Sequence, residues 1–433
     1  MSYDNMSGGS HVKPAELYKT TIAVWTTMIL LSSVVFHFAV HESTIFDAIL
    51  EATAAWTGTG ISAFDSASTP LWLQLFRSAC NWLGGIGIVM ISLTIIRPKR
   101  FRGWQLAATE VPGPYFLKNE SDFRRYYRRI ALVYVCFSVI QFLLLLLVDM
   151  DPIQAAMTAL SNSSSSGLHH INNGFVTALP TSTKAIITVF AFLSSLYSPL
   201  FLLALHRKWK RIKESSELNY YVARIVLVTV VLSGLVISKA PGGDYIKSIS
   251  SVFMQVISSL STSGYVISDM SAWPLSCVII ISLMIFTGAC SFSTGGGFKV
   301  SRLIIALKMI AHTLYKQVHP NSVRPLKYDK KPLKSESVVS ANLFIALFMI
   351  TYLLGALLLS LDKLSLLDSL SYSQAMLTGS GIPLISPEAT GLADGFSSYG
   401  KVVLSALMVA GRLEIYPLLM IFFESFWKTD SSL

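Results

Sequence analysis

The chain has 433 residues, of which 52% are hydrophobic and only 13% are charged. Soluble domains carry about 25% charged residues, so the composition argues against a soluble enzyme or binding domain and for long segments that face lipid. The net charge of +10 does not indicate nucleic-acid binding, because 24 of the 34 basic residues lie in three short connectors. These connectors are Arg97–Arg129, Arg207–Arg224 and Lys299–Lys334.

Eight apolar runs are long enough to cross a bilayer, which takes about 20 residues. They are Thr20–Val40, Leu71–Ile96, Tyr127–Val148, Lys184–Leu205, Tyr220–Ile237, Leu275–Ile310, Val338–Leu361 and Val402–Phe426. With both termini in the cytoplasm, all three basic connectors fall on the cytoplasmic side, as the positive-inside rule requires. The pattern predicts an all-α, multi-pass integral membrane protein.

Each outer connector begins with a half-apolar stretch that is too short to span. These stretches are His41–Trp56, Asp151–Leu160, Asp244–Leu260 and Ser365–Leu377. Each one leads into a loop of small hydroxyl residues around a glycine, and the loops are Thr57–Ser62, Ser163–Leu168, Ser261–Tyr265 and Thr378–Ile382. A unit of spanning helix, short helix, re-entrant pore loop and spanning helix thus occurs four times, which predicts four repeats around a pseudo-fourfold pore.

These repeats divide the chain into seven segments. They are an N-terminal cytoplasmic tail (1–19), pore repeat 1 (20–98), a cytoplasmic connector (99–125), pore repeat 2 (126–213), pore repeat 3 (214–311), a second cytoplasmic connector (312–336) and pore repeat 4 (337–433).

The loops themselves indicate a cation pore. Non-helical backbone at membrane depth is tolerated only where it is buried in protein or lines a wet cavity. Backbone carbonyls from four converging loops can replace the hydration shell of an ion. The negative C-terminal end of each short helix would favour a cation. Oxygen ligands without a ring of carboxylates suit a monovalent ion better than Ca²⁺ or Mg²⁺. One such loop is usually an ordinary external turn, but four copies argue against that reading.

Several motifs carry a family resemblance. They are Glu51–Thr53 leading into Thr59-Gly60, Trp82–Gly87, Ser293–Arg302, His319-Pro320 and Gly411–Ile415. Together they resemble the Trk/Ktr/HKT superfamily of potassium transporters, most closely the bacterial membrane subunit of Trk-type uptake systems. The likeness covers nearly the whole chain.

The resemblance implies a potassium selectivity filter. Its residues would be Thr59, Gly60, Ser166, Gly167, Ser263, Gly264, Ser380 and Gly381, with K⁺ held by backbone carbonyls near Thr59, Ser166, Ser263 and Ser380. Four filter glycines resemble potassium-selective members, whereas a serine in the first loop marks many sodium-selective plant relatives.

Other expectations follow from the same resemblance. They are a homodimer with one pore per protomer, a location in the bacterial inner membrane, and a cytoplasmic RCK-type nucleotide-binding ring as partner. The potassium ion would be the substrate, with no cofactor in this chain.

The sequence departs from the Trk-type pattern in two places. The larger Trk-type subunits carry two extra N-terminal helices, which are absent from the eight runs found here. Their fourth filter is often Asn-Asn-x-Gly-Pro-Gly, whereas this chain has Thr378-Gly379-Ser380-Gly381-Ile382-Pro383.

The sixth apolar run is too long for one straight crossing, and Gly288–Gly297 interrupts it. Mainly because of the resemblance, we expect a gate here, made of Gly288, Ser293, Thr294, Gly295, Gly296, Gly297, Lys299 and Arg412. The alternative is a flexible kink used for packing.

Arg412 is costly at mid-membrane, so it is expected to face the pore below the filter and contact the loop. An Arg–Glu pair between helices is the alternative. Lys299 either faces the cytoplasmic pore mouth or snorkels.

The remaining polar residues give weaker indications of function. His169 and His170 are expected in an exposed outer vestibule rather than in a metal site, and Asp65 and Asp269 either concentrate cations at the mouth or are ordinary loop carboxylates. No nucleophile with its base is evident, which argues against an intramembrane enzyme. A sodium-selective or sodium/proton-coupled transporter on the same scaffold remains open, as does the choice between channel-like and coupled transport.

Overall fold

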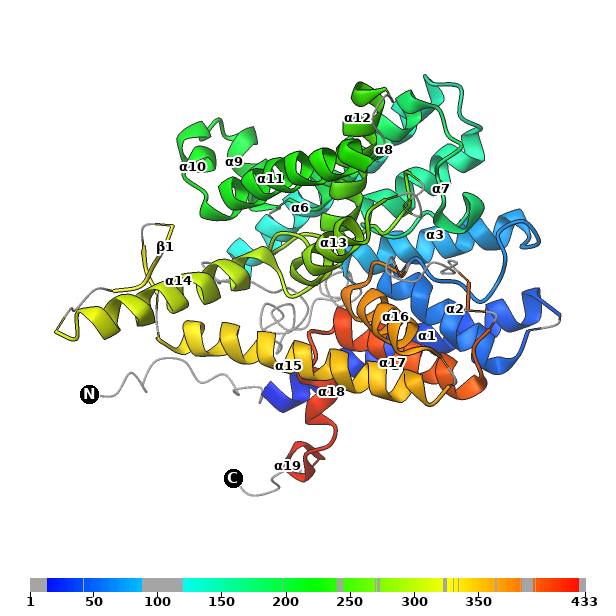
Figure 1. Ribbon diagram of the computed structural model, residues 1–433. Coiled ribbons are helices and arrows are strands. Elements are labelled where there is room, and N and C mark those ends of the chain that lie inside the picture. Colours follow the sequence, from blue (N-terminus) through cyan, green and yellow to red (C-terminus); the bar gives the residue numbers. More distant parts are fainter. Residues whose placement is uncertain are drawn as a thin grey trace.

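The computed structural model describes residues 14–41, 43–87, 120–196, 198–239, 244–268, 270, 273–321, 325–329, 331–333, 335–362, 364–381, 383, 392–393 and 395–427. Within these ranges the chain is helical apart from loops and one small antiparallel hairpin, in which Lys327 pairs with Pro332 and Tyr328 with Lys331. The expected all-α class is therefore confirmed. Figure 1 shows the hairpin and α10 (Trp209–Lys213) at one end of the molecule, on the left.

The remaining elements fall into four consecutive groups. The first has α1 (Pro14–Ala39), α2 (Ile45–Thr57) and α3 (Leu71–Ile86). The second has α6 (Glu120–Leu146), α7 (Pro152–Ser163), the 3-10 turn η1 (Asn172–Gly174), α8 (Thr181–Ser194) and α9 (Pro199–Leu205). The third has α11 (Ser216–Lys239), α12 (Tyr245–Leu260), α13 (Leu275–Thr287) and α14 (Val300–Val318), followed by strands β1 (Lys327–Tyr328) and β2 (Lys331–Pro332). The fourth has α15 (Ser335–Ser360), α16 (Leu366–Thr378), α17 (Ser398–Arg412), α18 (Tyr416–Met420) and α19 (Glu424–Trp427).

All four stretches expected to be short helices are helical, as α2, α7, α12 and α16. Local chemistry explains where each one begins. The side chains of Thr44, Asp151, Asp244 and Ser365 accept hydrogen bonds from backbone N–H groups in the first turn of their helices. Such caps satisfy donors that a helix leaves unpaired at its N-terminus. Each helix ends among small hydroxyl and glycine residues, and its C-terminal half is buried.

Four helices in the described part are long and apolar enough to cross a membrane: Tyr18–Ala39 of α1, Arg128–Leu146 of α6, α11 and α15. A fifth crossing results if α8 and α9 count as one span, although they meet at an angle of 98°. The predicted continuous runs Lys184–Leu205 and Val402–Phe426 are therefore corrected, because both are broken. Pro199 is the first residue of α9 and Pro417 the second residue of α18, and proline cannot donate the backbone bond that would continue a helix across the break. The predicted run Leu71–Ile96 is described only to Gly87.

Buried apolar clusters join neighbouring groups. One cluster combines Leu50 and Ile61 of the first group with Leu404 of the fourth, and another combines Leu168 with Val252 across the second and third. A third places Phe298 against Phe348. By contrast, the outer faces of α1, α6, α11 and α15 expose leucine, valine and phenylalanine, as expected for surfaces in contact with lipid.

Candidate functional site

The glycine loops that follow the four short helices converge on one another. A Cβ atom added at Gly60 would lie 3.1 Å from Gly167 Cα and 3.2 Å from the Ser380 carbonyl oxygen, and one added at Gly264 would also strike that carbonyl. The first loop therefore touches the second and the fourth, and the third touches the fourth. Only glycine allows backbones to approach so closely.

Hydrogen bonds farther along the loops from the glycines connect the other neighbouring pairs of loop regions. Val176 and Val266 join the second and third loop regions, with Val176 N 2.9 Å from Val266 O. Ala393 N donates to Ser62 O at 2.8 Å, which joins the fourth region to the first. Lys401 of α17 also pairs with Asp47 of α2 at 2.6 Å. The four loop regions thus follow one another in chain order around a ring.

Three loops share one backbone arrangement. The N–H groups of Thr59, Ser166 and Ser263 turn back to carbonyls of their own short helices, at 2.9, 3.0 and 3.2 Å. The C=O and N–H of a trans peptide point in opposite directions, so the carbonyls of the preceding residues point away from the helices. These preceding residues are Gly58, Ser165 and Thr262, and all three line the cavity described next.

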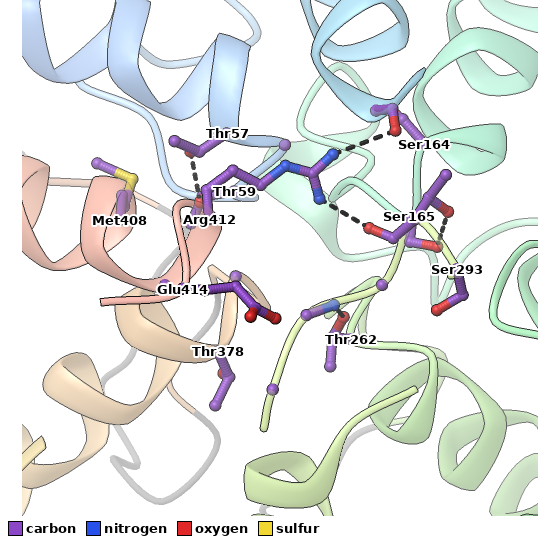
Figure 2. Close-up of a pocket in the computed structure, with 18 of the residues that line it drawn as sticks. Thr57, Thr59, Ser164, Ser165, Thr262, Ser293, Thr378, Met408, Arg412 and Glu414 are labelled. Carbon is purple, nitrogen blue, oxygen red and sulfur yellow. Dashed lines mark hydrogen bonds between the residues drawn. The ribbon is translucent and has the colours of Figure 1, made fainter. Parts of the chain in front are cut away.

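A cavity of about 90 Å³ lies at the ends of the four short helices. A water needs about 10–15 Å³ of such space, so several waters or a partly hydrated cation would fit. Its wall includes Thr57, Gly58 and Thr59 from the first loop, Ser164 and Ser165 from the second, Thr262 from the third, and Thr378 and Gly379 from the fourth. Figure 2 shows these hydroxyl side chains together with Arg412 and Ser293.

The segment Gly288–Gly297 lies beneath this ring, between α13 and α14. Gly296 N donates to Thr262 Oγ1 at 2.6 Å, and the hydroxyls of Thr294 and Ser165 lie 2.7 Å apart. Residues Ser293–Gly297 and Lys299 line the same cavity as Thr59. The other seven filter candidates do not line it, although neighbouring residues of their loops do. Gly288 does not line it, but its backbone packs against Gly296 and Gly297. The structure therefore places the segment Gly288–Gly297 against the loops that carry the candidate filter residues.

Arg412, at the end of α17, also lines the cavity. One guanidinium nitrogen donates to Thr294 O at 2.9 Å, and the other donates to Gly84 O at 2.8 Å. The expected contact between Arg412 and the loop is therefore present. The Arg–Glu pair weighed as the alternative involves another arginine, because Glu414 pairs with Arg302 of α14 at 2.7 Å. Arg302 also lies over the Phe344 ring.

For Lys299 one of the two alternatives is excluded, and for His169 and His170 the expectation is wrong. Lys299 does not snorkel; it is buried, and its Nζ donates to the Gly295 carbonyl within the loop. His169 does not lie in an exposed vestibule, because only 4% of its surface is exposed, and His170 is hydrogen-bonded to Thr158. Asp65 accepts a hydrogen bond from Asn173 at 3.0 Å, whereas Asp269 is outside the described residues.

The sequence analysis missed a buried ion pair behind the first loop. Arg77 of α3 lies 2.8 Å from Glu51 of α2, and the two side chains are 6% and 2% exposed. Arg77 Nη2 donates to Ile61 O at 2.6 Å, with Thr59 O farther away at 3.4 Å. Glu51 accepts from Ser62 Oγ at 2.6 Å. The signal available in the sequence was a charged residue inside an expected membrane span. Arg77 lies in such a span, as Arg412 does, but only Arg412 was singled out as a candidate.

Within the described residues, no group of three or more His, Cys, Asp or Glu side chains could hold a metal ion. The polar groups around the cavity are hydroxyls, backbone carbonyls, the cations Lys299 and Arg412, and the carboxylate of Glu414, which pairs with Arg302. The arrangement suits passage of an ion that backbone and hydroxyl oxygens can coordinate.

Comparisons with known proteins identify the family and the fold. The family model TrkH, described as a cation transport protein, matches residues 11–429. The chain is 25% identical to the Trk system potassium uptake protein TrkH of Escherichia coli K12, over 98% of this chain and 89% of that protein. It is 24% identical to TrkI of Halomonas elongata, over 96% and 85%. The crystal structure of the potassium transporter TrkH from Vibrio parahaemolyticus has the same fold, with a TM-score of 0.84 and 21% identity over 98% of this chain and 88% of that one. This chain belongs to the TrkH family of cation transport proteins.

Proposed function

We propose that this protein is the membrane subunit of a potassium uptake system and conducts K⁺ through a filter built from the four glycine loops. The observation that carries the proposal is the shared cavity, whose wall combines residues from all four loops with Ser293–Gly297 and Arg412. The relatives reported above are named as potassium uptake proteins, which favours K⁺ as the ion.

In this mechanism the ion leaves water at the outer mouth and is held by carbonyls at the positions of Thr59, Ser166, Ser263 and Ser380. It then enters the cavity, where the C-terminal ends of α2, α7, α12 and α16 converge. The partial negative charge of these helix ends stabilises a cation there.

Gly288–Gly297 and Arg412 form the gate of the proposed pathway. The loop covers the cavity from below through its bonds to Thr262 and Ser165. Arg412 adds a positive charge to the cavity wall and repels K⁺, and this repulsion is several-fold larger than in bulk water because the surroundings are poorly polarisable.

The wider architecture belongs to the same proposal. It comprises eight crossings in four pore repeats, both termini in the cytoplasm of a bacterial cell, a homodimer and a cytoplasmic RCK-type nucleotide-binding ring as regulator. The breaks after α8, α13 and α17 are consistent with second helices that cross the membrane in two pieces.

Ion flux through purified protein in liposomes tests the function. With opposed K⁺ and Na⁺ gradients, we expect K⁺ flux to exceed Na⁺ flux and to set the membrane potential. A preference for Na⁺, or flux that requires a sodium or proton gradient, would replace the proposal with the sodium-selective or coupled alternative.

A further inference from the structure

Helix α11 carries a buried polar face. Glu217, Tyr221 and Arg224 are spaced four and three residues apart, which places them on one side of a helix. Their exposed fractions are 4%, 0% and 7%. Charged side chains within a membrane span are costly and usually have a specific task. The mechanism described above uses none of the three.

All three side chains point to the segment that leads into the gate. Glu217 Oε1 accepts a hydrogen bond from Ser291 N at 2.6 Å, and Arg224 Nη2 donates to Met284 O at 2.7 Å. Tyr221 reaches the same segment through Ser195, whose hydroxyl lies 2.8 Å from the tyrosine oxygen and whose carbonyl accepts from Cys290 N at 3.0 Å. The backbone from Met284 to Ser291 is therefore held at both ends and near Cys290.

The same end of α11 is joined to the cytoplasmic hairpin. Ser216, the neighbour of Glu217, donates its backbone N–H to Asp329 Oδ1 at 2.8 Å, and Asp329 lies in the turn between β1 and β2. On the other side of the hairpin, Lys308 of α14 donates to Lys327 O at 2.9 Å. Two adjacent residues of α11 thus contact the gate segment and the hairpin.

We propose that Glu217 is a positioning residue that anchors the gate segment in its closed place, and that Asp329 couples the cytoplasmic hairpin to this anchor. The proposal rests on the proposed function, in which Gly288–Gly297 closes the pathway. A carboxylate suits the task because it only accepts hydrogen bonds, and the non-helical backbone at Ser291 needs an acceptor away from water. A partner that moves the hairpin would act on the gate through this contact.

The native thiol of Cys290 provides a test that does not depend on flux. Cys290 is next to Ser291 and is fully buried, so its rate of labelling by a maleimide reports release of the segment. Cys80, Cys136 and Cys277 are first replaced by serine. Glu217→Leu removes the acceptor at similar volume, whereas Glu217→Gln keeps an amide oxygen in its place and serves as the matched control.

We expect Glu217→Leu to raise the labelling rate about tenfold, since it removes a hydrogen bond to a charged group, and Glu217→Gln to restore the parent rate to within about threefold. Parent-like labelling in Glu217→Leu, or equal labelling in the leucine and glutamine variants, would overturn the anchor. If Glu217→Leu does not elute as folded protein in gel filtration, Glu217→Ala takes its place, with the same two outcomes.

Variants of Asp329 test the coupling to the hairpin, and measurements of K⁺ flux test the proposed gate. Asp329→Ala should raise Cys290 labelling, Asp329→Asn should not, and Asp329→Ala should add nothing to Glu217→Leu. Unchanged labelling in Asp329→Ala would overturn the coupling to the hairpin. K⁺ flux should rise along with labelling. Faster labelling with unchanged flux would support the anchor and contradict the proposed gate.

Discussion

Backbone contact at Gly60 leaves little room for a side chain. An added Cβ would lie 3.1 Å from Gly167 Cα, tighter than ordinary van der Waals contact, and the neighbouring atoms belong to two other loops. Backbone atoms cannot move aside by changing rotamer, so a substitution here must displace the first loop relative to the second or the fourth. Selectivity depends on those relative positions if the loops form the filter.

Gly60→Ser is therefore expected to lower the permeability ratio of K⁺ to Na⁺ by about tenfold, since overpacking of about 1–3 kcal/mol must be relieved by movement of the loops. Reversal potentials in liposomes with opposed gradients measure this ratio. Gly234→Ser on α11 is the matched control, because nothing lies within 4 Å of an added Cβ there. An unchanged ratio in Gly60→Ser would remove the first loop from the filter.

Variants of the buried Glu51–Arg77 pair distinguish an effect on the stability of the fold from an effect on K⁺ selectivity. Glu51→Gln leaves the Arg77 charge uncompensated and is expected to destabilise the protein by about 3–5 kcal/mol. Replacing both residues by methionine should be nearly neutral for stability, because a buried ion pair often contributes little compared with an apolar pair. The double variant still loses the hydrogen bond from Arg77 to Ile61 O, so its K⁺ preference should fall.

Thermal unfolding in detergent and reversal potentials measure the two effects. A double variant with normal stability and normal selectivity would show that the pair does not position the filter. Normal selectivity in Glu51→Gln, with reduced stability alone, would point to the same conclusion.

At the scale of the element, the features that could be predicted correctly are those set by residues close together in the sequence. The short helices were located within a few residues, because capping side chains such as Thr44 and hydroxyl-rich ends such as Ser163–Ser166 are local signals. The broken ends of α8 and α17 were missed, since hydropathy averages across a break. Pro199 and Pro417 were the local signals for these breaks.

Long-range pairs could not be predicted in this way. Glu51 and Arg77 are separated by a whole loop, and Glu217 of α11 is far along the chain from Ser291, which lies in the segment between α13 and α14. Periodicity says which face of a helix is buried but not which polar group lies opposite it. The contact of Arg412 with the loop was anticipated because a charge at mid-membrane needs a partner and because the resemblance pointed to a gate at Gly288–Gly297.

The gate segment and Arg412 are expected to act as one barrier. Deleting Ser293–Gly296 removes the cover of the cavity, and Arg412→Ala removes its positive charge, so each change should raise K⁺ flux while the K⁺/Na⁺ ratio stays constant. Arg412 donates to Thr294 O, which the deletion removes, so the combined effect should be smaller than the sum of the separate effects. Isotope uptake into liposomes, normalised to folded protein, measures all three variants.

Two results would contradict this arrangement. Parent-like flux in both single variants would make the loop and Arg412 packing elements, and fully additive effects would make them independent barriers. A changed K⁺/Na⁺ ratio after the deletion would mean that the loop also supports the filter.

At the scale of the whole molecule, charge is segregated along the chain. The connectors rich in lysine and arginine include the region of the hairpin, where Lys327 is exposed and Tyr328 is buried. The hairpin lies at the same end of the molecule as α10, which contributes Lys210, Arg211 and Lys213. A basic surface of this kind can steer an acidic partner by long-range attraction.

Neutralising Lys327, Lys330 and Lys331 together to glutamine should therefore weaken association with a cognate cytoplasmic RCK ring, although Lys330 lies outside the described residues. We expect the dissociation constant to rise about tenfold at low salt and the difference to shrink as salt is added, because exposed charges are screened over about 10 Å at 0.1 M.

Lys247→Gln is the control, because Lys247 is exposed beside Asp244 at the start of α12 and belongs to a predicted outer connector. Surface plasmon resonance with the ring immobilised measures both proteins across a salt series. Equal affinity of the triple variant and the parent at every salt concentration would place the docking surface elsewhere, and it would leave the filter and the gate untouched because neither depends on the hairpin lysines.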